Sequence, residues 1–257
     1  MHADVLMLLM VVLAATGAGW VDAVVGGGGL VQLPVLLLAF PGIAPTTLLA
    51  TDKLSSIAGT ATAAMGFARR TRLHWRLAAP VGLLAIAASG LGATLAGLVP
   101  PAVFRPAVLL VLLAIGVLVV LRPTLGSGSR PHRRSVGRAV LAVAVLGAVL
   151  PVYNGMIGPG TGSMMLMTLT ALWGLDFVIA SATTKVINLG SNIGALVVLA
   201  AHGPVFWVLG AAMAAGNMGG AWLGTRTALR RGTGFIRIAL LCVVSALLVK
   251  IGIDQFG

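Results

Sequence analysis

The sequence predicts an all-α polytopic membrane protein, from an apolar composition, a series of long apolar segments and an internal repeat. Of its 257 residues, 59% are hydrophobic and only 9% are charged, whereas a typical soluble domain carries roughly 25% charged residues. A water-soluble fold of this composition would expose more apolar surface than solubility allows, so we expect the lipid bilayer as its solvent. The same composition excludes a disordered chain.

The basic residues are grouped in a way that indicates membrane topology. The formal net charge is +12, and most arginines fall within three short clusters at 69–76, 122–138 and 226–231. Each cluster lies between apolar segments, as cytoplasmic loops do under the positive-inside rule. A basic stripe on a soluble domain is missing, so we expect no nucleic acid partner.

Metal and cofactor chemistry finds no support in the sequence. The single cysteine, Cys242, lies in an apolar run, and the four histidines have no metal-binding spacing. Neither glycine run is followed by the Gly-Lys-Ser/Thr of a phosphate-binding loop. We therefore expect no metal ion and no cofactor.

A shift of 132 residues aligns two halves of the chain without a gap. It matches Gly26 with Gly158, Gly28 with Gly160, Thr51 with Thr183, Lys53 with Lys185 and Trp75 with Trp207. Asp22 meets the near-isosteric Asn154. We interpret residues 1–121 as a first transmembrane repeat, 122–138 as a basic cytoplasmic linker and 139–257 as a second repeat.

Each half is predicted to hold about four full transmembrane helices and one short segment after a glycine-rich break. A helix needs about 20 residues to span a bilayer. The short segments are 29–41 and 162–175, which we interpret as half-helices or re-entrant pieces. The apolar segments lie at about 3–25, 29–41, 45–68, 77–99 and 101–121, and at 139–157, 162–175, 177–200, 205–224 and 234–253.

The basic clusters favour an inverted repeat. If each short segment crosses the membrane, each half has an odd number of passes, the halves are inverted, and all three clusters lie on one side. If the short segments re-enter, the count gives eight spans and parallel halves, with the 226–231 cluster outside. The positive-inside rule favours inversion, with both termini outside.

The two glycine runs are the first candidates for a functional site. They read Gly26-Gly27-Gly28-Gly29 and Gly158-Pro159-Gly160-Thr161-Gly162. Non-helical backbone inside a membrane must face protein, water or ligand. A helix that starts there directs free amide groups and its positive dipole end into the break, which suits an anion. Tight helix packing through a GxxxG pattern is the alternative interpretation.

Lys53 and Lys185 are the second signal, because each lies in a long apolar segment. A cation there costs at least about 2.5 kcal/mol and needs compensation. An anionic substrate would provide it; the alternatives are snorkelling or, for Lys53, a pair with Asp22 or Asp52. Lys185 has no nearby acid in sequence except Asp176, so an anionic substrate fits it better.

Polar residues follow each lysine at helical spacing. Lys53 and Ser56 share a face with Thr60, and Lys185 shares one with Asn188 and Asn192. Such stripes face a space that holds water or a ligand, or they form interhelical hydrogen bonds. Further hydroxyl donors are Thr51, Thr183 and Thr184.

Asp22 and Asp52 are the candidates for proton coupling. Asp22 precedes the first glycine run, and Asp52 precedes Lys53. For Asp22 we favour the simpler role of a partner to Lys53.

These motifs resemble the TauE/SafE family of sulfite exporters, also called the DUF81 or TSUP transporters. The resemblance rests on the duplicated glycine break, the half-helix LVQLPVLLL with Pro34 and the following Ala-Thr segment. It implies bacterial inner-membrane transporters of sulfite, thiosulfate, sulfoacetate and other organic anions. Asp52 and Thr184 stand where that family would suggest a serine, and Leu166 stands opposite Pro34, which leaves the exact anion open.

We therefore expect a multi-pass secondary transporter that exports a small oxyanion by alternating access. A passive anion channel is the main alternative. A membrane-embedded enzyme is a weaker one, because the sequence has no paired acids, no histidine-rich site and no nucleophile motif. The expected partners are a small anion and the bilayer, and a homo-oligomer is left open. The candidate substrate-binding residues are Gly26, Gly27, Gly28, Gly29, Thr51, Lys53, Ser56, Asn154, Gly158, Gly160, Thr161, Gly162, Thr183, Thr184, Lys185, Asn188 and Asn192.

Overall fold

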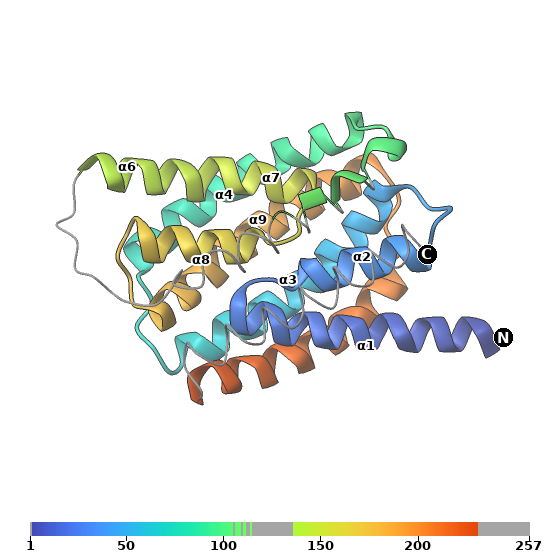
Figure 1. Cartoon of the computed structure of the whole chain (residues 1–257), viewed down its shortest axis with the longest axis horizontal. Helices are drawn as coiled ribbons and strands as arrows, with labels where there is room; N and C mark the ends of the chain where they lie inside the picture. Colours follow the sequence, from blue (N-terminus) through green and yellow to red (C-terminus); the bar gives the residue numbers. More distant parts are fainter. Residues whose placement is uncertain (1, 105, 109, 112–113, 115–135, 231–257) are drawn as a thin grey trace.

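The computed structural model describes residues 2–104, 106–108, 110–111, 114 and 136–230, and the regular elements within them are helices (Figure 1). The predicted linker at 122–138 lies almost wholly outside these residues, the last segment at 234–253 lies wholly outside them, and 101–121 is described only in part. The prediction of an all-α membrane protein is confirmed. The elements are α1 (His2–Val25), α2 (Gly29–Ala39), α3 (Pro45–Ala68), α4 (Trp75–Leu98), α6 (Val136–Ala144), the π-helical turn η1 (Val145–Val149), α7 (Leu150–Met156), α8 (Thr161–Ala171), α9 (Phe177–His202) and a helix over 207–230.

Among the described residues, four apolar stretches are long enough to cross a membrane. They are Leu6–Val25, Trp75–Leu98, Val136–Met156 (α6, η1 and α7 together) and Phe177–His202, of 20 to 26 residues. A helix of 20 residues is about 30 Å long, which matches the hydrocarbon core of a bilayer. Exposed side chains such as Leu98 and Val208 provide the apolar outer surface that lipid requires.

The 132-residue shift matches helix with helix. α8, α9 and the 207–230 helix each begin 132 residues after α2, α3 and α4 respectively. Matched elements also run in opposite directions: in Figure 1, α1 runs from right to left and α6–α7 from left to right. An inverted repeat requires that matched helices run in opposite directions. The symmetry that relates the two halves stays a prediction.

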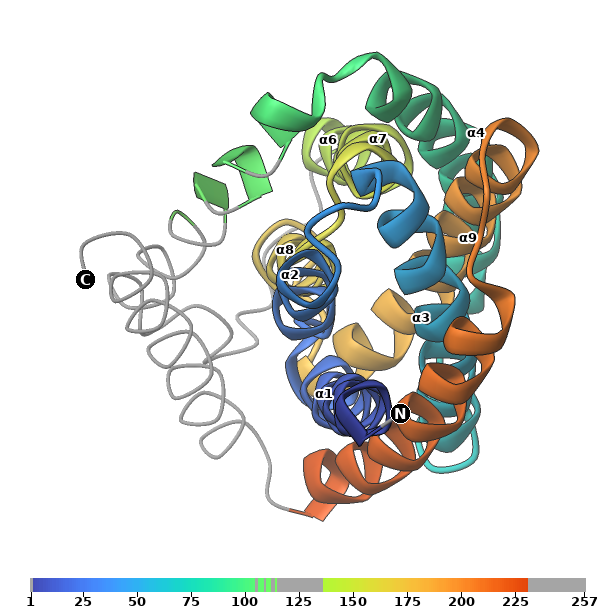
Figure 2. The ribbon, with the colours of Figure 1, turned by 90° about the vertical axis from the view of Figure 1, so that its right-hand side faces the viewer.

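The two short helices turn back beside the helices that precede them. In Figure 1, α2 returns from the end of α1 toward the right, and α8 returns from the end of α7 toward the left. The two overlap in Figure 2, the view along the long axis, so they lie nearly end to end. With 11 residues each, they are about 16 Å long, half the thickness of the hydrocarbon core. Whether each short segment counts as a crossing or as a re-entrant piece stays a prediction.

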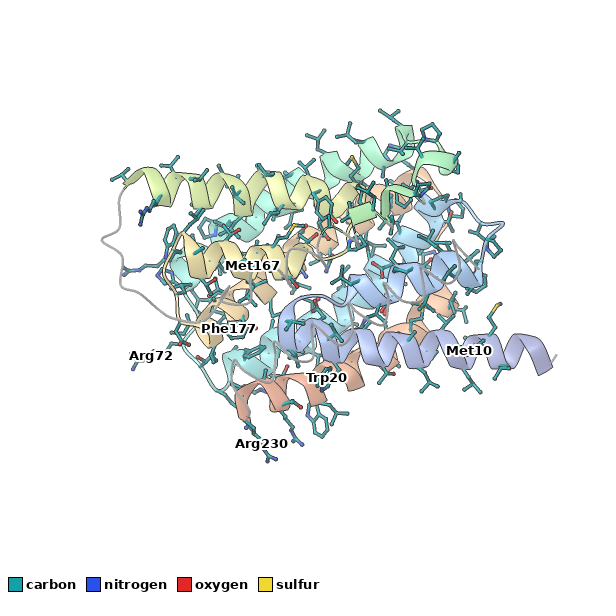
Figure 3. The ribbon with its side chains drawn as sticks, viewed as in Figure 1. Met10, Trp20, Arg72, Met167, Phe177 and Arg230 are labelled. Carbon is teal, nitrogen blue, oxygen red and sulfur yellow. The ribbon has the colours of Figure 1, made fainter. Side chains whose placement is uncertain are left out.

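Basic residues gather at one end of the molecule, where Figure 3 labels Arg72 and Arg230. Arg72 lies between α3 and α4, as expected for a loop. The expectation of a loop at 226–231 is wrong for its first part, because Arg226 and Arg230 belong to the 207–230 helix. The Arg226 guanidinium lies 3.6 Å from the centre of the Trp222 ring, a cation–π contact that holds it on the helix.

Glycines bring several helices into close contact around the site. A Cβ on Gly194 of α9 would lie 2.0 Å from the Ile86 carbonyl oxygen of α4, and one on Gly220 would lie 1.8 Å from the Thr16 carbonyl oxygen of α1. Small residues at such crossings let backbones approach, as is common in membrane bundles. The helices that carry the polar side chains are thereby fixed against their neighbours.

Candidate functional site

The two glycine breaks meet inside the bundle. Gly26 and Gly158, equivalent under the repeat, both have a positive φ (77° and 100°), which favours glycine. A Cβ on Gly26 would lie 2.4 Å from the Gly162 carbonyl carbon, and one on Gly162 would lie 2.4 Å from the Gly26 oxygen. The backbones of the two breaks are therefore in direct contact.

Two helix N-termini face this meeting point. α2 begins at Gly29 and α8 at Thr161. Their N-cap residues, Gly28 and Gly160, have no side chain that could accept a hydrogen bond from the helix. The positive dipole ends of both helices are thus directed toward the centre of the bundle. The Leu30, Val31 and Thr161 amides already donate to carbonyl oxygens of the glycine breaks, and the other first-turn amides add donors there. The Thr161 hydroxyl donates to the Gly158 carbonyl at 2.8 Å and steadies the second break.

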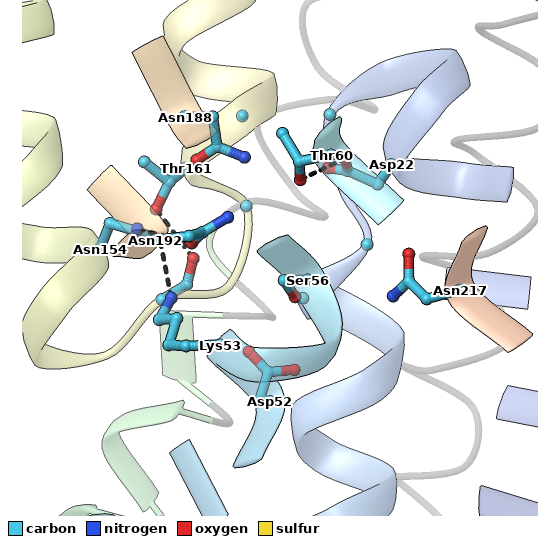
Figure 4. Close-up of a pocket in the computed structure, with 16 residues that line it drawn as sticks. Asp22, Asp52, Lys53, Ser56, Thr60, Asn154, Thr161, Asn188, Asn192 and Asn217 are labelled. Atoms are coloured by element: carbon cyan, nitrogen blue, oxygen red, sulfur yellow. Dashed lines mark hydrogen bonds between the residues drawn. The ribbon is translucent and has the colours of Figure 1, made fainter. Parts of the chain in front are cut away.

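A small polar cavity lies beside the breaks (Figure 4). Its volume is about 20 Å³, which is room for about one water molecule. An anion of four or five heavy atoms needs a wider cavity. The lining residues are Asp22, Gly26, Gly28, Gly29, Asp52, Lys53, Ser56, Thr60, Asn154, Gly158, Gly160, Thr161, Gly162, Asn188, Asn192 and Asn217.

Lys185 is paired with a carboxylate of the other half. Its Nζ lies 3.0 Å from Asp22 Oδ2 and also donates to the Asp22 carbonyl oxygen. The lysine side chain is 1% exposed and the aspartate 13%. The expectation that Asp22 pairs with Lys53 is therefore wrong, because the fold brings the end of α1 against α9.

Lys53 meets a neutral acceptor instead. Its Nζ donates to Asn154 Oδ1 at 2.8 Å, and the lysine is 2% exposed. Asn154 in turn donates from Nδ2 to Ser191 at 2.8 Å and to Asn192 at 3.0 Å. The amide is held from both sides, so its oxygen is aimed at the ammonium group.

The two lysine contacts are equivalent under the repeat. Lys53 corresponds to Lys185 and Asn154 to Asp22, so each lysine reaches the residue that precedes the glycine run of the opposite half. The chemical difference between the two contacts is an amide in place of a carboxylate. Lys185 therefore has a carboxylate in direct contact, whereas the group in direct contact with Lys53 is an amide.

Asp52 is part of a buried polar cluster with Gln32, Ser55 and Asn217 that borders the same cavity. Gln32 Nε2 donates to Asp52 Oδ1 at 3.0 Å, and Gln32 Oε1 accepts from Asn217 at 2.7 Å and from Ser55 at 3.2 Å. Gln32 and Asn217 were not predicted as site residues. The only sequence signals were a lone amide inside the apolar half-helix and another within a glycine-rich segment.

Several predicted residues do not line the cavity. Thr51 and Thr183 donate to carbonyl oxygens one turn earlier, those of Thr47 (2.8 Å) and Ile179 (2.7 Å). Such back-bonding is the usual alternative to an outward-facing hydroxyl. Gly27, Thr184 and Lys185 also lie outside the lining, although Lys185 touches Asp22, which is part of it.

Two described polar side chains beside the lysines are buried without a hydrogen-bond partner. They are the Thr184 hydroxyl and the Asn188 Oδ1 atom. Asn188 lines the cavity, while Thr184 does not. An unsatisfied buried polar atom is costly and marks a place where water or a ligand would bind.

Comparisons with known proteins identify the family of the chain. The family model described as "Sulfite exporter TauE/SafE" matches residues 11–251. A probable membrane transporter protein, ORF9, from Sinorhizobium is 34% identical over 96% of this chain and 93% of its own length. A probable membrane transporter protein from Haemophilus influenzae is 31% identical over 98% of both chains. YfcA of Escherichia coli, also a probable membrane transporter protein, is 32% identical over 98% of this chain and 92% of its own.

No solved structure was found to match the chain. The family match covers nearly the whole sequence, and it includes both glycine breaks and both lysines. This chain belongs to the TauE/SafE family and is a multi-pass membrane transporter.

Proposed function

We propose that this transporter exports a small sulfur-containing or organic oxyanion, such as sulfite or a sulfonate, across the bacterial inner membrane. The observation that carries the proposal is the buried Lys53, whose ammonium contacts a neutral amide at 2.8 Å beside a cavity faced by two helix N-termini. A buried cation without a bound carboxylate attracts an anion, and the helix ends add amide donors.

Alternating access suits a site of this shape. The cavity is too small for the anion and lies where the two halves meet. Rocking of one half against the other would widen it toward one side at a time, as in transporters built from structural repeats. The end that carries Arg72 and Arg230 would face the cytoplasm under the positive-inside rule.

The membrane potential suits export. An interior-negative potential drives an anion outward with about 2.3 kcal/mol per charge per 100 mV. Asp22 and Asp52 are the groups through which a proton could be coupled to this movement. Asp22 is engaged by Lys185, so Asp52, whose carboxylate accepts from the neutral Gln32, is the better proton carrier.

Anion flux in proteoliposomes tests the proposal. The purified protein is assayed with sulfite, sulfate, taurine, sulfoacetate and lactate, and compared with Lys53→Ala, Lys185→Ala and the exposed Arg72→Ala as control. We expect saturable flux with counterflow for at least one sulfur oxyanion, a large loss in Lys53→Ala and none in Arg72→Ala. Flux that rises linearly with concentration and shows no counterflow would indicate a passive channel, and no flux of any anion would refute the substrate class.

A further inference from the structure

We propose that the site selects a small monoanion that carries its own hydrogen-bond donor, in preference to a dianion or to a monoanion without a donor. This inference rests on the proposed function. It concerns which oxyanion the cavity between the glycine breaks accepts.

Asn188 supplies the first observation. Its side chain lines the cavity and is 6% exposed, and its Oδ1 atom has no hydrogen-bond partner among the described residues (Figure 4). Lys53, Asn154 and Thr161, which line the same cavity, are engaged by protein groups. The Asn188 Oδ1 atom is therefore a buried, unpaired acceptor on a residue that lines the cavity, and an acceptor is the wrong group for a bare oxyanion.

Displacement of water decides what this acceptor selects. Widening of the cavity during transport would expose Asn188 Oδ1, and a water molecule can then donate to it. A substrate that expels this water must replace its hydrogen bond or leave a buried acceptor unpaired, which weakens binding. An O–H or N–H group on the substrate replaces that bond, whereas a bare sulfonate oxygen or a methyl group does not.

The charges around the cavity supply the second observation. Lys53, Asp52 and Asp22 line it, and Lys185 is held on Asp22 at 3.0 Å. The formal charges of these four side chains sum to zero. A monoanion introduces one charge that the helix N-termini and Lys53 can stabilise, and a dianion introduces twice as much beside two carboxylates.

The two observations give one recognition pattern. The oxyanion end of the substrate would be bound by Lys53 and the first-turn amides of α2 and α8. Its donor group would point to Asn188 on α9. Hydrogen sulfite, with a hydroxyl, and small aminosulfonates fit this pattern; sulfate and thiosulfate do not.

Three anions with the same number of heavy atoms provide the test. Sulfamate is a monoanion with N–H donors, methanesulfonate is a monoanion with a methyl group in the same place, and sulfate is a dianion. Half-saturation concentrations are measured in proteoliposomes at neutral pH. We expect sulfamate to bind about tenfold more tightly than methanesulfonate, the effect of one buried hydrogen bond, and sulfate to bind more weakly than either.

Two variants connect the preference to Asn188. In Asn188→Leu, which keeps the volume and removes the acceptor, the ratio of sulfamate to methanesulfonate should fall to about one. Ser89→Ala removes another unpartnered buried polar group, on α4 and outside the cavity lining, and should leave the ratio unchanged.

The outcomes separate this inference from the proposed function. Equal affinities for sulfamate and methanesulfonate in the parent protein would overturn the inference even if Asn188→Leu did not fold. A preference that persists in a folded Asn188→Leu protein would overturn it too. If no sulfur oxyanion, including sulfite, showed saturable flux, the proposed function itself would fail.

Discussion

The two halves of the molecule place a lysine at the same point of equivalent helices but give it different partners. Lys185 on α9 is 3.0 Å from the Asp22 carboxylate, whereas Lys53 on α3 is 2.8 Å from the Asn154 amide oxygen. A carboxylate neutralises an ammonium group and an amide does not. The comparison indicates a structural role for one lysine and a ligand-attracting role for the other.

The variant Asn154→Asp removes this difference and is expected to have the largest effect. The new carboxylate would neutralise Lys53 and repel an incoming anion, so flux should fall by roughly 100-fold, equivalent to about 3 kcal/mol. Initial rates in proteoliposomes measure this loss. The protein should remain folded, because the variant copies a pair already present between Asp22 and Lys185.

The double variant Asp22→Asn with Asn154→Asp controls for the added acid. It keeps the number of carboxylates and exchanges the partners of the two lysines. Flux should stay low, because Lys53 still faces a carboxylate although the number of acids is that of the parent protein. Unchanged flux in the single variant Asn154→Asp would show that the charge of Lys53 does not bind the anion.

The variant Asp22→Asn tests the structural role of the pair between Asp22 and Lys185. It leaves Lys185 buried without a counter-charge, and removal of one partner from a buried pair typically destabilises a protein by about 3–5 kcal/mol. Asp22 is 13% exposed, so we expect about 3 kcal/mol. Unfolding in detergent measures the effect. An unfolding midpoint equal to that of the parent would mean that the pair is not structural.

The glycines of the breaks differ from other glycines of the bundle in what surrounds them. In Gly26→Ala, the new Cβ would collide with the Gly162 backbone at 2.4 Å, and the positive φ would be strained. We expect a destabilisation of about 2–3 kcal/mol and a loss of transport. Gly97→Ala is the matched control, because a Cβ there meets nothing within 4 Å in α4, and it should stabilise the helix slightly. Equal stability of the two variants would contradict the contact between the breaks.

Local patterns in the sequence were sufficient to predict the framework of the site. The two long glycine runs interrupt the helices, and the constant 132-residue shift placed the starts of α2, α3 and α4 opposite those of α8, α9 and the 207–230 helix. The polar stripe with Lys53, Ser56 and Thr60 follows from helical spacing alone. All three residues line the cavity.

The partners of these residues could not be predicted, because they are set by packing between distant helices. Asp22 is 31 residues from Lys53 and 163 from Lys185, yet it pairs with the latter. Asn217 contacts Gln32 across 185 residues, and its equivalent under the repeat is the apolar Ala85. Periodicity carries no information about such contacts, and the repeat relates the two lysine contacts to each other only once one of them is known.

Asp52 and Thr184 form the last unequal pair, and they predict the smallest effect. Asp52 is hydrogen-bonded to Gln32, whereas the buried Thr184 hydroxyl has no partner among the described residues. Thr184→Val keeps the shape and removes the unsatisfied group, so it should stabilise the protein by about 1 kcal/mol in detergent. In the control, Thr183→Val, the hydroxyl that donates to Ile179 is removed, and stability should fall by about 0.5 kcal/mol. If Thr184→Val instead destabilised the protein, the hydroxyl would have to bind water or the transported anion, and Thr184 would join Asn188 as part of the site.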